Sequence, residues 1–471
     1  MTTTVPRTDP DFVLSTIADL AAAVRGPVLV PADEGFAFEV APFNTSYAPR
    51  PAVVVGATCA ADVAAAVRFA AATGRPVAVQ ATGHGLTGAL EGAVLVTTGR
   101  MAEVAVDPVA GTARVGAGAR WRAVIDAAAP HGLAPLNGSS SGVGVVGYTL
   151  GGGLGPLARR YGFAADHVRR AQLVTADGAV REVDATSDPE LFWALRGSKG
   201  SFGIVTELEF DLVPVTSLHG GFVFFPGEAA GALLHAWREW VTTLPEETTT
   251  SIAVLRMPPD PSLPPPLQGR TVVHLRFAHL GPADEGAALL APMRATAPAL
   301  LDTVADMPYT AVDGIHMDPT DPLPSWHTGT TLRELPAEAV DALLVVAGPE
   351  VEVPLIMVEL RHLGGALARP AAVPDAVVGR DAAFALWVLG PMAPPLAEVV
   401  PAVGRAVVAS VAPWALRGPL LNFLGEAHPA DVAALWDDAD RARLLAVKRR
   451  LDPTGVFGTG HVLPAAGDRV A

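Results

Sequence analysis

The sequence predicts an α+β fold divided into two domains, and three changes of composition along the chain support this prediction. Residues 51–215 alternate short β-rich runs with alanine-rich helices and glycine-rich loops. Residues 216–410 place proline-rich loops between longer strands and helices, which predicts a separate domain with a broad sheet backed by helices. Residues 411–471 return to short elements and glycine loops, so we expect this segment to rejoin the first domain, residues 1–215.

Apolar periodicity and turn residues predict the individual elements in order. In the first domain we expect helices at 11–25, 59–73, 120–129 and 188–195, strands at 51–55, 76–80, 92–98 and 203–213, and hairpins at 103–117 and 171–183. Thr58 is the expected N-cap of the second helix and Gly74 its end. In the second domain we expect helices at 228–243 and 335–346 and strands at 271–277 and 354–361.

Composition and charge exclude several classes of protein. The chain has 471 residues and a formal charge of −15, which argues against nucleic acid as the main partner. Cys59 is its single cysteine, so neither a disulfide framework nor a cysteine-based metal site is expected. No apolar run reaches about 18 residues, and residues 1–10 lack the pattern of a signal peptide. We therefore expect no membrane span and a cytoplasmic location.

The glycine-rich stretch from Gly138 to Gly155, GSSSGVGVVGYTLGGGLG, is the most informative part of the sequence. Glycines at this density let the backbone approach a ligand closely, and backbone N–H groups can surround a pyrophosphate. Residues within this stretch match two known sequence motifs. Residues 142–147 match the dinucleotide fingerprint G-x-G-x-x-G, and residues 138–142 match the serine-hydrolase motif G-x-S-x-G around Ser140. Both need a following helix, which Gly151–Gly153 would break, so we disfavour both.

Two further glycine loops carry charged or titratable side chains. Residues 80–88, QATGHGLTG, place His84 between two glycines, where a planar ligand could reach its ring. The alternative is a turn histidine in solvent. Residues 195–205, LRGSKGSFGIV, contain no phosphate-binding P-loop, and Lys199 is interpreted as a solvated loop cation. His316, His327 and Asp318 have no standard metal-ligand spacing, so no metal site is expected.

The order of these stretches resembles the PCMH-type FAD-binding domain of the vanillyl-alcohol oxidase superfamily, in its berberine bridge enzyme-like branch. The resemblance rests on RPAVVVGATCAADVAAAVRFA, VAVQATGHG, GLAPLNGSSSGVGVVGYTLGGGLGPLARRYGFAADHV, VTADGAV, DPELFWALRGSKGSFGIVTELEFDLVPV and KRRLDPTGVFG. It covers residues 47–215 densely and the C-terminal tail more weakly. It implies a two-subdomain FAD-binding domain, a substrate domain with an antiparallel sheet at 216–410, and a tail at 411–471 that returns to the FAD-binding domain.

The resemblance also implies how FAD is held. His84 occupies the place of the histidine that the family joins covalently to the 8α-methyl group of FAD. The cysteine that makes a second bond in many members falls at Ser140, so we expect a single covalent bond. Val143 occupies the position that gates the access of oxygen to the flavin in this family. A residue of this type goes with oxidases there, whereas bulkier residues go with dehydrogenases. The implied cofactor-binding residues are Gln80, Ala81, Thr82, Gly83, His84, Gly85, Leu86, Ser139, Ser140, Gly142, Val143, Gly144, Gly147, Tyr148, Gly152, Gly153, Gly155, Gly203, Ile204, Val205 and Asn422.

The family's usual base is missing from this sequence. Many members use a tyrosine in a Y-x-N motif, and the matching residues here are Leu420, Leu421 and Asn422. The candidates to replace it are Glu359, Tyr148 and His362. Glu359 has Arg361 on the same strand face, so a purely structural ion pair is an equal alternative. For Tyr148 the alternative is a hydrogen bond to the cofactor.

These observations predict an FAD-dependent oxidase that transfers a hydride from a small organic molecule to flavin N5 and passes electrons to O2. Composition suggests a bacterial enzyme of secondary metabolism. Three alternatives stay open: a cyclase or isomerase that uses FAD as a scaffold, a non-catalytic flavin- or ligand-binding protein, and a serine hydrolase. The sequence predicts neither the substrate nor the oligomeric state.

Overall fold

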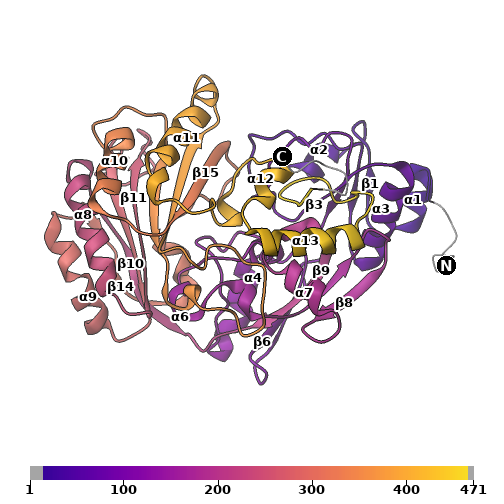
Figure 1. Ribbon diagram of the computed structural model, residues 1–471, viewed down its shortest axis with the longest axis horizontal. Helices are drawn as coiled ribbons and strands as arrows, with labels where there is room; N and C mark the ends of the chain where they lie inside the picture. Colours follow the sequence, from indigo (N-terminus) through magenta and orange to yellow (C-terminus); the bar gives the residue numbers. More distant parts are fainter. Residues whose placement is uncertain (1–13, 465–471) are drawn as a thin grey trace.

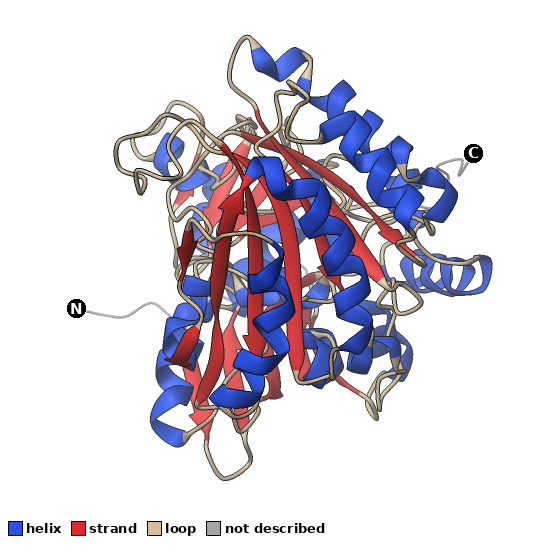
Figure 2. Ribbon diagram, turned by 90° about the vertical axis from the view of Figure 1, so that its left-hand side faces the viewer, coloured by secondary structure: helices blue, strands red, loops and turns tan. Residues whose placement is uncertain are grey.

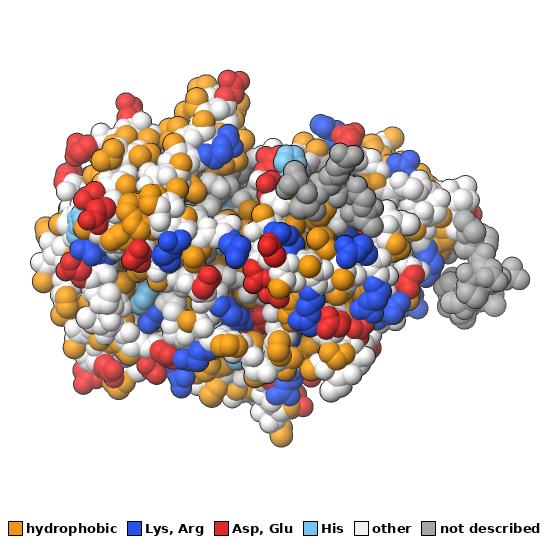
Figure 3. Space-filling view, in the orientation of Figure 1, with side chains coloured by type: hydrophobic (Ala, Val, Ile, Leu, Met, Phe, Trp, Pro, Cys, Tyr) orange, Lys and Arg blue, Asp and Glu red, His pale blue; other side chains and the backbone are white. Residues whose placement is uncertain are grey.

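A computed structural model describes residues 14–464, which form three sheets accompanied by helices. This confirms the mixed fold class that the sequence predicts. Figure 1 shows a large sheet covered by helices on the left, and two smaller sheets with the C-terminal helices on the right. Within the described residues, no helix has the length and apolar character needed to cross a lipid bilayer. On the face shown in Figure 3, acidic and basic side chains are intermixed.

The first small sheet is largely parallel, and the predicted glycine loop at residues 80–88 follows its edge strand. Its strands lie in the order β1 (Val28–Leu29), β2 (Val53–Gly56), β4 (Val94–Thr97) and β3 (Val77–Gln80). The helices α1 (Ile17–Ala23), α2 (Phe36–Val40) and α3 (Ala60–Thr73) accompany it. Helix α1 is shorter than the helix predicted over 11–25, of which residues 11–13 lie outside the described residues.

Helix α3 joins the parallel strands β2 and β3. Valine and alanine side chains on it are fully buried against the sheet, which explains why the alanine-rich sequence forms a helix here. The predicted N-cap is wrong by one residue, because the helix begins after Cys59. Thr58 instead donates its hydroxyl to the carboxylate of Asp62 at 2.7 Å. Gly74 ends the helix with a φ of 64°, as expected from its sequence.

The second small sheet is antiparallel and confirms both predicted hairpins. Its order is β5 (Val104–Asp107), β6 (Thr112–Gly116), β9 (Ile204–Asp211), β7 (Val168–Val174) and β8 (Val180–Asp184). Helices α4 (Trp121–Ala128) and α7 (Pro189–Leu195) pack against it. Asp188 begins α7 by accepting the N–H of Leu191 at 3.0 Å.

The large sheet is antiparallel throughout and has eight strands. Its order is β13 (Leu301–Asp302), β10 (Ser217–Pro226), β12 (Thr271–His279), β11 (Thr248–Arg256), β16 (Met357–His362), β17 (Phe384–Pro391) and β15 (Ser325–Leu332), while β14 (Ala305–Pro308) pairs with β10. Figure 2 shows its outer face covered by helices. These are α8 (Ala230–Trp240), α9 (Ala283–Thr296), α10 (Ala337–Ala347) and α11 (Val400–Ser410). The opposite face contributes side chains to the cavity described below.

The C-terminal helices pack on the half of the molecule that holds the small sheets. Helices α12 (Pro429–Ala433) and α13 (Asp438–Leu451) lie over it in Figure 1, and α13 contacts α7. Lys448 of α13 is buried, pairs with Asp452 at 2.7 Å and donates to the carbonyl of Ser201 at 2.9 Å. The exact domain boundaries at 215 and 410 stay a prediction.

Candidate functional site

One large cavity lies where the glycine loops meet the inner face of the large sheet. Its volume is about 1300 Å³, above the roughly 300–1,000 Å³ of most small-molecule sites. Loops 77–91, 138–154 and 199–205 line one side, and residues 255–258 and 353–361 of the large sheet and its loops line another. The cavity therefore has room for a large cofactor together with a small substrate.

The loop after β3 presents a neutral histidine to this cavity. The ring of His84 stacks on Phe43 with ring centroids 3.8 Å apart, and its Nδ1 lies 2.8 Å from the hydroxyl of Thr82. Burial, together with the charge of Arg120, lowers the pKa of His84 to about 4. Gly83 enables the tight turn, because its φ is 74° and a Cβ there would approach Pro42. His84 is thus an unprotonated imidazole at neutral pH.

The glycines of the second loop make room for an aromatic ring as well as for a ligand. Helix α5 (Val145–Leu150) carries Tyr148, whose ring lies against Gly138 and Gly153. A Cβ on those glycines would lie 2.8 Å and 2.6 Å from ring atoms. Gly147 is different, because nothing in the protein lies within 4 Å of the Cβ it lacks, and it lines the cavity.

Tyr148 brings a buried hydroxyl to the cavity wall. Its Oη has no hydrogen-bond partner among the described residues. Burial raises the pKa of Tyr148 far above its ordinary value, although the nearby charge of Arg361 lowers it in part. The phenol is therefore protonated at neutral pH, which suits a hydrogen-bond donor and not the proton-accepting base suggested by the sequence.

Most of the predicted cofactor-binding residues line this one cavity, and three do not. Those lining it are Gln80, Ala81, Thr82, Gly83, His84, Gly85, Leu86, Ser139, Ser140, Val143, Gly144, Gly147, Tyr148, Gly153, Gly203, Ile204, Val205 and Asn422. The three that do not line the cavity are Gly142, Gly152 and Gly155. Gly155 packs on the carbonyl of Asn137 and Gly152 on Val377, so these two glycines allow close packing of the loop.

The structure also explains why the two short motif matches mislead. No strand leads directly into Gly142, and α5 ends at Leu150, just before the glycine run, so the dinucleotide fingerprint lacks its strand and most of its helix. Ser140 accepts a hydrogen bond from the N–H of Gly142 at 3.3 Å. In residues 14–464 no histidine is hydrogen-bonded to this serine, so the arrangement of a serine hydrolase is absent there.

Lys199 is not the solvated cation that its loop predicts. The residue has a φ of 53°, lines the cavity, and places its Nζ 2.9 Å from Nδ1 of His461. His461 donates through Nε2 to the carbonyl of Gly425, so its Nδ1 accepts from the lysine. Burial lowers the pKa of Lys199 to about 8. Its ammonium group has no carboxylate partner within 4 Å in the described part of the chain.

Two of the three predicted catalytic residues do not line the main cavity. Glu359 is fully buried and bonded to Arg361 at 2.9 Å, to Arg276, and to the hydroxyl of Ser251 at 2.8 Å. Burial raises the pKa of Glu359, but the positive charges of Arg361 and Arg276 lower it by more, so the pKa lies below its usual range. The structural ion pair is therefore the correct interpretation of Glu359.

His362 lies on the opposite face of β16 and is also removed from the main cavity. Its Nε2 is 3.1 Å from a guanidinium nitrogen of Arg159. Burial and this neighbouring charge lower the pKa of His362 to about 3. His362 does not line the large cavity, and its neutral imidazole is held by Arg159, so the geometry gives its assignment as catalytic no support.

Sequence reasoning missed two arginines that line the cavity from the large sheet. Arg276 of β12 and Arg361 of β16 both face it, with His316 and Trp387 nearby in the lining. The sequence pattern indicates Arg361 only as a partner of Glu359. A signal for Arg276 was present, because it is a charged residue inside the apolar run TVVHLRFAH.

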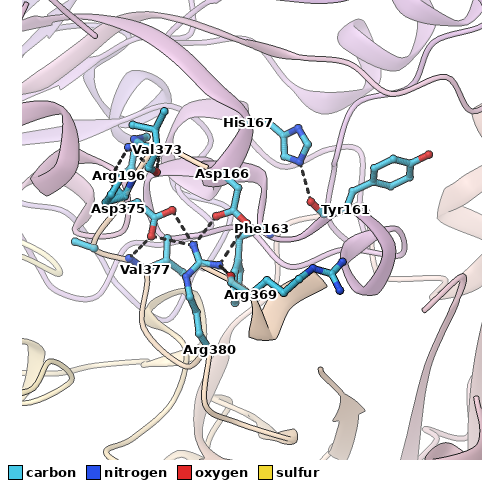
Figure 4. Close-up of polar contacts among 12 residues, drawn as sticks. Tyr161, Phe163, Asp166, His167, Arg196, Arg369, Val373, Asp375, Val377 and Arg380 are labelled. Atoms are coloured by element: carbon cyan, nitrogen blue, oxygen red, sulfur yellow. Dashed lines mark hydrogen bonds and ion pairs between the residues drawn. The ribbon is translucent and has the colours of Figure 1, made fainter. Parts of the chain in front are cut away.

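A buried ion cluster fixes residues 373–380 over the glycine loop. Figure 4 shows Arg380 between Asp166 and Asp375, with Nη2 at 2.6 Å and 2.7 Å from their carboxylates. Burial raises the pKa of Asp375 to about 6, and the charge of Asp166 adds to this while Arg380 opposes it. Arg196 donates to the carbonyl of Pro374 at 2.6 Å. These contacts place Val377, which lines the cavity, against Gly152.

Comparisons with known proteins agree with this arrangement. Residues 51–184 match the model of an FAD binding domain. A similar curated relative is (R)-6-hydroxynicotine oxidase of Paenarthrobacter nicotinovorans, 35% identical over 45% of this chain and 47% of the relative. The chain spans less than half the length of the curated relatives it matches first. Several relatives are fungal, so they do not support the expected bacterial source.

Solved structures match over nearly the whole chain. The crystal structure of 6-hydroxy-D-nicotine oxidase from Arthrobacter nicotinovorans is 26% identical with a TM-score of 0.81, covering 94% of this chain and 98% of that one. The berberine bridge enzyme-like protein 1 of Physcomitrella patens has a TM-score of 0.83 at 19% identity, covering 96% and 100%. Residues 51–184 are therefore an FAD binding domain, and the chain has the fold of the PCMH-type, berberine bridge enzyme-like oxidases.

Proposed function

We propose that this protein is an FAD-dependent oxidase of a small organic molecule, with FAD attached once, through His84, and O2 as electron acceptor. The observation that carries the proposal is the neutral imidazole of His84 at the wall of a cavity large enough for FAD and a substrate. The FAD binding domain and the oxidase relatives support it. Nothing in these comparisons supports a cyclase.

The residues at the cavity are suited to hold FAD. Lys199 is a cation without a carboxylate partner in the described chain, which suits an anionic group of the cofactor. Gly147 leaves open space where a flat ring system could approach the backbone. Tyr148 Oη and Gln80 Oε1 are buried polar atoms without protein partners, one a donor and one an acceptor.

His84 is suited to the covalent bond by its protonation state. A neutral imidazole has a lone pair available, and Nδ1 is engaged by Thr82, so Nε2 is the nitrogen that we assign to the bond. When bound, FAD would supply the 8α-carbon, and His84 would supply the unprotonated nitrogen that holds it.

The other residues have separate roles in the proposed reaction. When bound, FAD supplies the site that accepts a hydride from the substrate. The chain then positions the substrate's C–H bond and excludes water with the apolar wall of Leu355, Met357 and Leu389. Tyr148 donates a hydrogen bond through its protonated hydroxyl, and Asn422 fixes the Tyr148 backbone by donating to its carbonyl at 2.9 Å.

The proposal is tested by following the flavin spectrum and oxygen together. The purified holoprotein is mixed with a panel of small alcohols, amines and organic acids, first without oxygen and then with it. An oxidase substrate bleaches the flavin anaerobically, and air then restores the colour with one H2O2 formed per turnover. A compound that is converted with neither bleaching nor oxygen uptake would contradict the proposal and favour a redox-neutral reaction.

A further inference from the structure

The substrate side of the cavity has an uncompensated positive charge. Arg276, Ser251 and Arg361 lie side by side on the adjacent strands β12, β11 and β16, because Ser251 is in register with both arginines. The short serine side chain leaves space for both guanidinium groups. They share the single carboxylate of Glu359, which accepts from Arg361 Nε at 2.9 Å and from Arg276 Nη1. Two positive charges thus face one negative charge, in a protein whose overall charge is −15.

Other groups near these arginines do not cancel the charge. Glu91 and Asp318 are carboxylates in the cavity lining, but Glu91 pairs with Arg50 at 2.6 Å, and neither lies within 4 Å of Arg276 or Arg361. His316 and His274 are neutral, because burial and the nearby arginines lower their pKa values well below the usual range. One of the two positive charges on Arg276 and Arg361 therefore lacks a protein counter-ion in residues 14–464.

Arg361 also has free hydrogen-bond donors. Its Nε is taken by Glu359, and no hydrogen bond joins Nη1 or Nη2 to a residue in the described part of the chain. The guanidinium carbon lies 5.0 Å from the ring centroid of Phe423 and 5.7 Å from that of Trp387. The indole Nε1–H of Trp387 is likewise buried without a partner. A buried arginine with free in-plane N–H donors is a frequent partner of a carboxylate, which it binds through two parallel hydrogen bonds.

We propose that Arg361, backed by Arg276, binds a carboxylate of the substrate, and that Trp387 and Phe423 contact its planar body. The substrate class is then an aromatic or similarly planar organic acid. This inference rests on the proposed function, because it concerns the substrate of the same cavity. Arg361 acts here as a binding residue that fixes one end of the substrate.

The test compares an anionic probe with its neutral analogue on the FAD-loaded protein. Sodium benzoate and benzamide are titrated by calorimetry, with the flavin difference spectrum as a second signal. We expect benzoate to bind at least about 10-fold more tightly than benzamide. Arg361→Gln should weaken benzoate binding by about 10- to 100-fold and leave benzamide binding within about 2-fold. Arg361→Lys should recover part of the loss, since it keeps the charge but not the planar donors.

Control variants separate this result from misfolding. Arg361→Gln leaves the buried pair of Arg276 and Glu359 neutral as a whole, so we expect it to fold and to keep its FAD. Arg369→Gln removes an exposed arginine that pairs with Glu246 at 2.6 Å, and it should bind benzoate like the unmodified protein.

Two outcomes distinguish the inference from the proposed function. If FAD is bound but benzoate binds no better than benzamide, or Arg361→Gln leaves benzoate binding unchanged, the inference is overturned and the proposed function stands. If the protein neither contains nor takes up FAD, the proposed function fails. The same titration of the FAD-free chain then decides whether Arg361 binds carboxylates.

Discussion

Replacing Asp375 by asparagine should change how stability depends on pH. The pKa of Asp375 is raised from 3.8 to about 6, and each unit corresponds to about 1.36 kcal/mol, so ionising this buried carboxyl costs the folded protein about 3 kcal/mol. Between pH 3.8 and 6 the folded protein holds a proton that the unfolded chain has released. Stability from this group is therefore lost as pH rises through that window.

Asparagine at position 375 has no proton to lose, so the variant lacks this decline. We expect the free energy of unfolding of Asp375→Asn, relative to the unmodified protein, to rise by about 2.5 kcal/mol between pH 4 and pH 7. Urea unfolding followed by tryptophan fluorescence at several pH values measures this difference, in which contributions from titratable groups outside the ion cluster cancel. Asp438→Asn, at a side chain 92% exposed, is the control. A difference that stays constant with pH, or falls, would refute the electrostatic account of the cluster.

Three further predictions concern the cavity wall and the buried ion pair behind it. Glu359→Gln leaves two buried guanidinium groups without a counter-ion, so it should lower stability by about 3–5 kcal/mol; an inactive variant with unchanged thermal stability would point back to a catalytic role. Gly147→Ala meets open space in the protein, so it should fold while losing FAD, measured as the ratio of flavin to protein absorbance. Full FAD content would contradict the assigned position of the cofactor. Tyr148→Phe removes a hydroxyl without a protein partner, so we expect an intact fold and a shifted flavin absorption band; an identical spectrum would exclude contact with the flavin.

The cofactor loops could be predicted from the sequence because their chemistry is local. His84 lies between glycines in a short loop after a strand, and the backbone geometry of such a loop is encoded in neighbouring residues. The same holds for the two hairpins, whose turns contain aspartate and glycine. The packing of the Tyr148 ring against Gly138 and Gly153 was readable in principle, since small residues on both sides of an aromatic residue indicate room for its ring.

The catalytic candidates could not be ranked from the sequence because their surroundings come from distant strands. Glu359 becomes structural through Arg276, which is 83 residues away in the sequence and reaches it across Ser251 of β11. No local pattern shows that β12, β11 and β16 are neighbours. Lys199 was misjudged for a similar reason, since His461 reaches it from a tail 262 residues further along the chain.

Weighing the intact protein after acid denaturation tests the central claim most directly. If FAD is joined to His84, the yellow colour stays with the precipitated protein and the mass of the chain rises by one FAD. His84→Ala should lose that added mass. A chain with no added mass that releases its colour into the supernatant would contradict the covalent bond. A colourless chain that takes up no FAD would contradict the assignment of the cavity as a flavin site.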